Sequence, residues 1–191
     1  MKILFTKKVL LFLIFISPFL FAQNKGHLVI IGGGSKPEYV LKKIIEFAGG
    51  ADSKIIVIPN ASSDKEGTGI YNANEFKELG CKHSEYISFD KETANSDSIL
   101  NKVKGTTGIY FSGGDQALLT KDLLGTKLFA EIKNIYKNGG VISGTSAGAA
   151  VMSKVMITGN ELINNDSTTA FKAIIKNNVE TTEGFGFITS A

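Results

Sequence analysis

Short apolar runs alternate with longer amphipathic segments along most of the chain from Gly26 onward. Most of the runs end at glycine or proline, which is typical of strands buried on both faces. The segments between them carry apolar residues at helical spacing, as Leu41, Ile44 and Ala48 do. This alternation predicts an α/β fold, a three-layer sandwich in which helices cover both faces of a mostly parallel sheet. The expected strands are 27–31, 55–58, 85–89, 108–111 and 141–143, and the expected helices are 37–48, 72–79, 96–103, 118–124, 126–137 and a helix of small residues after residue 148.

The first 22 residues have the character of a secretory signal. Three lysines precede residues 9–21, which are nearly all apolar, and this run is shorter than a bilayer span needs. Ala22 supplies a small residue at the expected cleavage point. An uncleaved membrane anchor is the alternative. We therefore expect a signal peptide at 1–22, one domain at 23–191, a secreted or periplasmic location, and no stable membrane insertion after cleavage.

The composition narrows the class of partner. All 21 basic residues are lysines, and there are 18 acidic residues. Without its leader the chain is neutral and has no arginine, which is a poor match to nucleic acid, since a basic face supplies most of that affinity. Cys81 is the only cysteine, and His27 and His83 are the only histidines. These residues predict neither an internal disulfide nor a metal site.

Glycine-rich turns follow three of the expected strands, at residues 32–36, 112–116 and 144–148. Ligands of parallel α/β sheets bind at the carboxyl ends of the strands, so function is expected at these turns. The first turn begins like a dinucleotide-binding loop, but Pro37 stands at the third glycine position. A tight strand-to-helix turn is the other interpretation of this loop.

The third turn has the pattern Gly144-x-Ser146-x-Gly148 between an expected strand and an expected helix. A sharp turn of this type raises a serine hydroxyl above the sheet. The next amide, that of Ala147, then points to the position where an oxyanion forms in acyl transfer. The same residues also fit a turn that only lets a helix pack closely against the sheet. The pattern alone leaves a nucleophile and a packing turn as alternatives.

The second turn predicts the opposite wall of the same site. It also leaves a strand and enters a helix, and Gly114 and Asp115 are expected to present backbone N–H groups to the cleft. Asp115 equally fits an ordinary helix N-cap. Two glycine-rich strand ends, each opening a helix, together predict a two-sided oxyanion site.

These turns resemble the cyanophycinase family of serine peptidases, which is related to the aspartyl dipeptidases. The segments that carry the resemblance are FSGGDQ at 111–116, SGTSAGAAVM at 143–152, IGGG at 31–34 and IPNAS at 58–62. The resemblance implies a flavodoxin-like sheet related to class I glutamine amidotransferases, and no cofactor. It also implies that Ser146 is the nucleophile, that Gly114, Asp115 and Ala147 surround the oxyanion, and that Gln116 contacts the substrate. The family's substrate is a polymer of aspartate and arginine, cut at β-linked Asp-Arg units, and exported members are expected to act on other peptides.

One departure from the family concerns the general base. A serine nucleophile needs a base, usually histidine, and in the family it follows the serine. Here no histidine follows residue 83. Residues 183–188 resemble the stretch directly before the family's histidine, and the sequence then stops at Ala191. The chain is therefore interpreted as a fragment of a longer enzyme, a shortened inactive relative, or an enzyme with another base.

The residues that we considered as substitute bases each have a simpler interpretation. The two histidines are expected at the amino-terminal edge of the sheet, away from Ser146. The remaining candidates are Lys154, expected on a helix face directed away, Ser62 with Lys65, which fit an ordinary helix start, and Glu161, a polar loop residue.

A rival function is a secreted module that binds a small carboxylated ligand without cleaving it. Amidotransferase chemistry needs a cysteine where Ser146 stands. Because the histidine is missing, we expect little or no hydrolase activity from this chain. We also expect an open sheet edge that favours aggregation. The sequence is compatible with a homo-oligomer and leaves the substrate open.

Overall fold

The computed structural model describes residues 26–162 and 178–189. The predicted leader and most of the polar stretch after residue 160 lie outside the described residues. Five strands form one sheet in the order β1-β5-β4-β2-β3, and each neighbouring pair is parallel. Its strands are β1 (His27–Ile31), β2 (Lys54–Ile58), β3 (His83–Tyr86), β4 (Gly108–Phe111) and β5 (Val141–Thr145).

The helices of the described residues connect these strands. They are α1 (Glu38–Phe47), α2 (Lys65–Glu78), α3 (Asp97–Lys102), α4 (Gln116–Leu123), α5 (Lys127–Lys137) and α6 (Ala147–Ala150), with a 3₁₀ turn at Thr93–Asn95. In residues 26–162 and 178–189, no helix has both the length and the apolar character of a membrane span.

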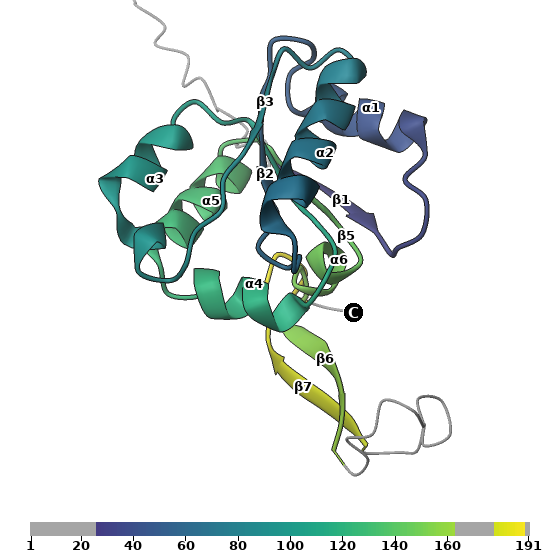
Figure 1. The fold of residues 1–191 in the computed structure, drawn as a ribbon, viewed down its shortest axis with the longest axis vertical. Coiled ribbons are helices and arrows are strands. Elements are labelled where there is room, and N and C mark those ends of the chain that lie inside the picture. The colour runs from purple at the N-terminus through teal and green to yellow at the C-terminus, as the bar shows by residue number, and fades with distance from the viewer. Residues whose placement is uncertain (1–25, 163–177, 190–191) are drawn as a thin grey trace, which may run out of the picture.

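The sheet lies between two helical layers (Figure 1). Alternate residues of β2 point to opposite faces. Ile56 and Ile58 belong to a core shared with α3, α4 and α5, while Ile55 and Val57 belong to a second core shared with α1 and α2. All four side chains are completely buried. The predicted three-layer α/β sandwich is confirmed, because both faces of the sheet are covered.

The strand order brings the predicted turns together. Counted from β2, it is the flavodoxin-like order 2-1-3-4-5, with β1 in the fifth place beside β5. The direction of winding therefore changes between β2 and β4, and the loops after these two strands lead to α2 on one face and α4 on the other. The loops at 59–64, 112–116 and 144–148 all lie at the carboxyl edge of the sheet, since every strand pair is parallel.

Two predicted helices have other bounds in the structure. Helix α2 begins at Lys65 and not at residue 72. Its first turns contain Gly67 and Gly69, which are poor helix formers, but the Asp64 carboxylate accepts the Gly67 N–H at 2.9 Å and caps the helix. The helix predicted after Gly148 is a single turn, α6.

The sequence pattern did not predict the antiparallel hairpin of β6 (Val155–Glu161) and β7 (Val179–Glu183). This hairpin extends away from the sandwich, at the bottom of Figure 1. The chain returns to the body after it, where Phe185 is buried in the core of α4 and α5 and the Ile188 carbonyl accepts the Lys154 N–H.

Candidate active site

Ser146 stands at the junction of β5 and α6 in a strained conformation. Its φ of 52° is the only positive value of a non-glycine residue among the described residues. Its N–H donates to the Ile31 carbonyl at 2.9 Å, which ties the turn to the end of β1. The residue is exposed. Strained backbone that surrounding structure holds in place is concentrated at functional sites, so this residue is the centre of the candidate site.

The two glycines that flank Ser146 are required by close backbone contacts. A methyl group at Gly144 would lie 2.5 Å from the Gly148 carbonyl oxygen, and one at Gly148 would lie 2.2 Å from the Phe111 carbonyl oxygen of β4. No side chain fits at either position without moving backbone. The sequence left two interpretations of this turn, one in which it packs a helix closely and one in which it exposes a serine. The structure shows both features in the same turn.

The second glycine turn lies directly against Ser146. A methyl group at Gly113 would lie 3.3 Å from the Ser146 Cβ and 3.9 Å from its Oγ. Gly114 has a φ of 138°, and a methyl group there would lie 2.0 Å from the Ala61 carbonyl oxygen. The 112–116 turn is therefore confined between the serine turn on one side and the β2–α2 loop on the other.

The amides of this region differ in their partners. The Asp115 N–H donates to the Ala61 carbonyl at 2.8 Å, and the Asp115 carboxylate accepts the Ala117 N–H at 2.8 Å. The Asp115 N–H is therefore already donated to another segment, and Asp115 is the N-cap of α4. Its place beside an oxyanion stays a prediction. The N–H groups of Gly114 and Ala147 donate to no other described residue.

Gln116 has a role that its sequence position did not suggest. Its Nε2 donates to the carbonyls of Ile157 at 2.9 Å and Thr158 at 2.8 Å, so it fastens the start of α4 to β6. The predicted contact of Gln116 with a substrate stays a prediction, and its Nε2 is already bonded to β6.

The two histidines lie at the other edge of the sheet. His27 pairs with Val141 at the start of β5, while Ile31 pairs with Thr145 at the end. The strand length separates these edges by about 13 Å. His83 pairs with Lys54 at the start of β2. The prediction that both histidines lie away from Ser146 is confirmed.

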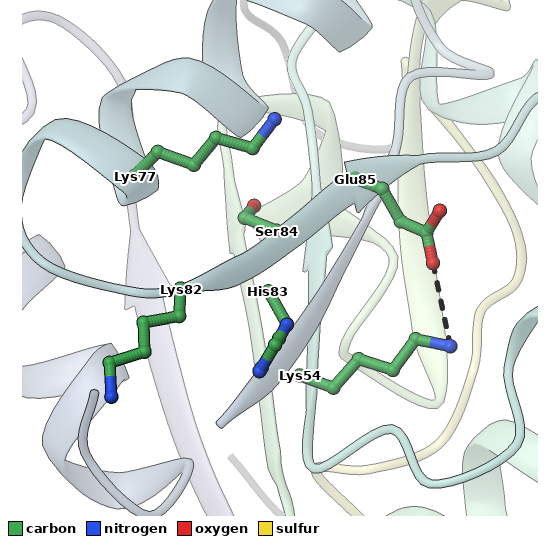
Figure 2. A pocket seen from close by; sticks show the side chains of 6 residues that line it. All are labelled: Lys54, Lys77, Lys82, His83, Ser84 and Glu85. Carbon is green, nitrogen blue, oxygen red and sulfur yellow. Dashed lines mark ion pairs between the residues drawn. The ribbon is translucent and has the colours of Figure 1, made fainter. Parts of the chain in front are cut away.

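The surroundings of the histidines are those of an ordinary surface. The His27 ring stacks on Phe47 with centroids 4.0 Å apart. Figure 2 shows the hollow of about 520 Å³ beside β3 that His83 lines. Two of its lysines are already paired, Lys54 with Glu85 at 3.4 Å and Lys82 with Asp52 at 2.7 Å.

The other candidate bases are engaged elsewhere. Ser62 Oγ lies 2.8 Å from Thr68 Oγ1, and the Lys65 ammonium lies 3.7 Å from Asp122, so the two do not form a Ser–Lys pair. Lys154 lies in an exposed bend between α6 and β6, so its predicted place on a helix is wrong.

Glu161, at the end of β6, accepts the Asn178 side-chain amide at 3.1 Å. No group of three histidine, cysteine, aspartate or glutamate side chains suited to a metal occurs in the described part of the chain.

The loop after β1 is fixed by a half-buried lysine. The Lys36 ammonium contacts the carboxylate of Glu75, lies 2.6 Å from the Asn72 Oδ1 and lies over the rings of Tyr71 and Tyr110. Burial and the nearby Glu75 carboxylate raise the pKa of Tyr110 far above its ordinary value. These contacts support the tight-turn interpretation of residues 32–36, since they bind the loop to α2.

Comparison with known proteins places this arrangement among the peptidases. The parallel α/β sheet is the arrangement that this chain shares with them, and in this chain an exposed serine lies between a strand and a helix. The model of peptidase family S51 matches residues 28–180, and the chain belongs to this family.

Relatives and solved structures agree with the assignment. A cyanophycinase of Synechococcus elongatus is 32% identical over 139 residues, which are 70% of this chain and 43% of the relative. A cyanophycinase of Geminocystis herdmanii is 33% identical over 140 residues, covering 71% of this chain and 52% of the relative. The chain thus spans about half the length of the curated relatives it matches.

Two crystal structures share the fold. A peptidase from an acI-B1 actinobacterium superposes with a TM-score of 0.63 at 25% identity, covering 89% of this chain and 68% of that one. A putative peptidase E protein from Listeria monocytogenes EGD-e superposes with a TM-score of 0.52 at 20% identity, covering 85% and 75%. The second likeness concerns the fold alone.

Proposed function

We propose that the chain carries the acyl-transfer centre of a secreted serine-type peptidase that cleaves peptide or isopeptide bonds of aspartate, with Ser146 as nucleophile. The observation that carries the proposal is the strained, exposed Ser146. The N–H of Ala147, next in the chain, and that of Gly114, in the turn that contacts Ser146 through Gly113, donate to no described acceptor. The cyanophycinase relatives support the choice of β-linked Asp-Arg units as substrate.

In this reaction the Ser146 Oγ attacks the substrate carbonyl while its proton passes to a base. The carbonyl oxygen becomes an oxyanion that the Gly114 and Ala147 amides stabilise, and loss of one such donor typically lowers turnover about 10²–10³-fold. The C–N bond then breaks, the amine leaves with a proton, and water hydrolyses the ester on Ser146.

No histidine base lies near Ser146, because both histidines of the sequence lie at the amino edge of the sheet. We expect slow or no turnover of a β-Asp-Arg dipeptide by this chain. Free imidazole replaces a missing histidine base in part, so it should accelerate covalent labelling of Ser146 by a fluorophosphonate.

The test measures labelling by mass spectrometry with and without imidazole. Ser146→Ala should abolish it, and Ser62→Ala, in the neighbouring turn, should not. Labelling of Ser146 that needs imidazole supports the proposal, and rapid Ser146-dependent turnover without imidazole contradicts the expected inactivity. If Ser146 stays unlabelled both with and without imidazole, the proposal that Ser146 is the nucleophile is contradicted.

The second candidate is a module that binds a small carboxylated ligand, which the distance of both histidines from Ser146 favours. Calorimetric titration with a β-Asp-Arg dipeptide separates the two. Binding without labelling indicates the module, and imidazole-dependent labelling indicates the peptidase.

A further inference from the structure

Asn60 is a polar side chain in the core directly behind the candidate site. It is completely buried, just after β2. Its Nδ2 donates to the Phe89 carbonyl at 2.6 Å and to the Asp122 Oδ2 at 2.8 Å, while its Oδ1 has no partner. Asp122 is only 8% exposed, and its nearest cation is Lys65 at 3.7 Å. Buried groups of this kind are costly to desolvate, so packing alone does not explain them.

The neighbouring residues Asn60 and Ala61 hold opposite ends of α4. The Asn60 side chain bonds Asp122 in the last turn of the helix, and the Ala61 carbonyl accepts the N–H of Asp115, the N-cap. The two contacts are about two helical turns apart, or about 10 Å. Helix α4 is thus fixed along its axis and in its tilt by one short segment.

The position of α4 decides where the Gly114 amide points. The Ala61 carbonyl lies so close to Gly114 that a methyl group there would come within 2.0 Å of the oxygen. Gly113, one residue earlier, lies against Ser146. A shift of Asn60 and Ala61 is therefore transmitted through backbone contacts to the wall of the site that faces the serine.

We infer that Asn60 and Asp122 are positioning residues for the oxyanion turn, which hold the Gly114 amide in line with Ser146 by fixing both ends of α4. The role in catalysis rests on the proposed function, but the positioning itself can be measured without any reaction. Neither side chain touches a substrate in this assignment.

The first measurement is amide hydrogen exchange of the whole chain. Asn60→Ala should speed exchange of the Asp115 amide about tenfold, because its acceptor is no longer held. The amides of Tyr110 and Ile142, in the central strands, should keep their rates. Asp122→Ala should reproduce the local effect and serves if Asn60→Ala does not fold.

Two matched variants separate positioning from general loss of packing. Asp122→Asn keeps an acceptor for the Asn60 amide and should leave the Asp115 rate within about twofold of the wild-type rate. Asn72→Ala removes another buried asparagine, which contacts Lys36 on the opposite face of the sheet. This variant should also leave the exchange rate of the Asp115 amide unchanged. Equal acceleration of all amides in Asn60→Ala, or none at Asp115, overturns the inference.

The second measurement is imidazole-assisted labelling of Ser146 at increasing probe concentration. Asn60→Ala should lower the limiting rate about 10–100-fold with an unchanged half-saturating concentration, since misplacement acts on the transition state. Asp122→Asn, which keeps an acceptor for the Asn60 amide, should keep the limiting rate of the wild type. If the wild-type protein stays unlabelled, the proposed function is contradicted but the inference about Asn60 and Asp122 is not. The hydrogen-exchange rates then test that inference by themselves.

Discussion

The two edges of the one parallel sheet differ in almost every physical respect. At the carboxyl edge, backbone segments contact each other directly at Gly144, Gly148 and Gly114, and Ser146 is held in a strained conformation. At the amino edge, the exposed pair of Lys82 and Asp52 and the stacked His27 ring lie on an ordinary surface.

This difference shows why residue types alone do not make a site. The chain has a serine and two histidines, the side chains of a hydrolytic pair, but the parallel register places them about 13 Å or more apart. Interlocked backbone confines the carboxyl edge, so small changes there should have large effects. Equal changes at the amino edge should have small ones.

The largest effect is expected for Gly148→Ala. The new methyl group would lie 2.2 Å from the Phe111 carbonyl oxygen, which is backbone of a central strand and moves only with the sheet. We expect a loss of about 3 kcal/mol of unfolding free energy in urea. Gly32→Ala is the control, because its methyl group meets nothing within 4 Å, and it should change stability by less than about 0.5 kcal/mol. Equal losses of unfolding free energy in Gly148→Ala and Gly32→Ala would show that the backbone around Gly148 can move to make room for a methyl group.

A gain in stability is expected for Ser146→Gly. Glycine tolerates the φ of 52°, so the strain is released, while part of the gain is lost to the greater entropy of the unfolded chain. The net increase should be about 0.5–1 kcal/mol. Ser146→Ala keeps the strain and should match the wild type. If Ser146→Ala were also more stable than the wild type, the gain would come from removing the hydroxyl group and not from releasing backbone strain.

At the amino edge, His27→Ala should cost about 0.5–1 kcal/mol, because it removes the ring stacked on Phe47. His27→Phe should restore most of this loss. His83 has no ring contact in the described residues, so His83→Ala should change thermal unfolding very little. Neither substitution should alter imidazole-assisted labelling of Ser146, and a slower rate in either one would place that histidine in the site.

The smallest effect concerns Asp52. The hydrogen bond from Lys82 lowers the pKa of the Asp52 carboxyl below its ordinary value of 3.8. Its contribution to stability is therefore present above that value and is lost as the pH falls through the lowered pKa. Both side chains are largely exposed, so Asp52→Asn should show no measurable change in melting at neutral pH and physiological salt. A clear change in melting would mean that the amino edge is less open than its exposure indicates.

The periodic parts of the chain were accessible from the sequence. Residues 55–58 of β2 are an unbroken apolar run, and α1 and α5 carry apolar residues at helical spacing, so each showed its own pattern. The start of α2 did not, because Gly67 and Gly69 hide a helix that depends on its Asp64 cap. Hairpin β6–β7 joins residues more than fifteen positions apart, and no local pattern specifies that pairing.

The candidate site divides in the same way. The turn around Ser146 could be recognised because its glycines are adjacent in sequence and their spacing reflects a local conformation. The partner of the Asp115 amide could not, since the Ala61 carbonyl is brought there by packing of distant segments. The same holds for Asn60 with Asp122 and for Gln116 with β6.

The sequence by itself determined the layered α/β fold, the glycine turns and the serine between them, because apolar periodicity and glycine spacing act over a few neighbouring residues. Only the tertiary structure decided which amides near Ser146 are already bonded to distant segments, as the Asp115 N–H is to the Ala61 carbonyl. It also decided the contacts of Asn60 with Asp122 and of Gln116 with β6. Those outcomes depend on strand order and register, which are set by the burial of two whole sheet faces and not by any single segment.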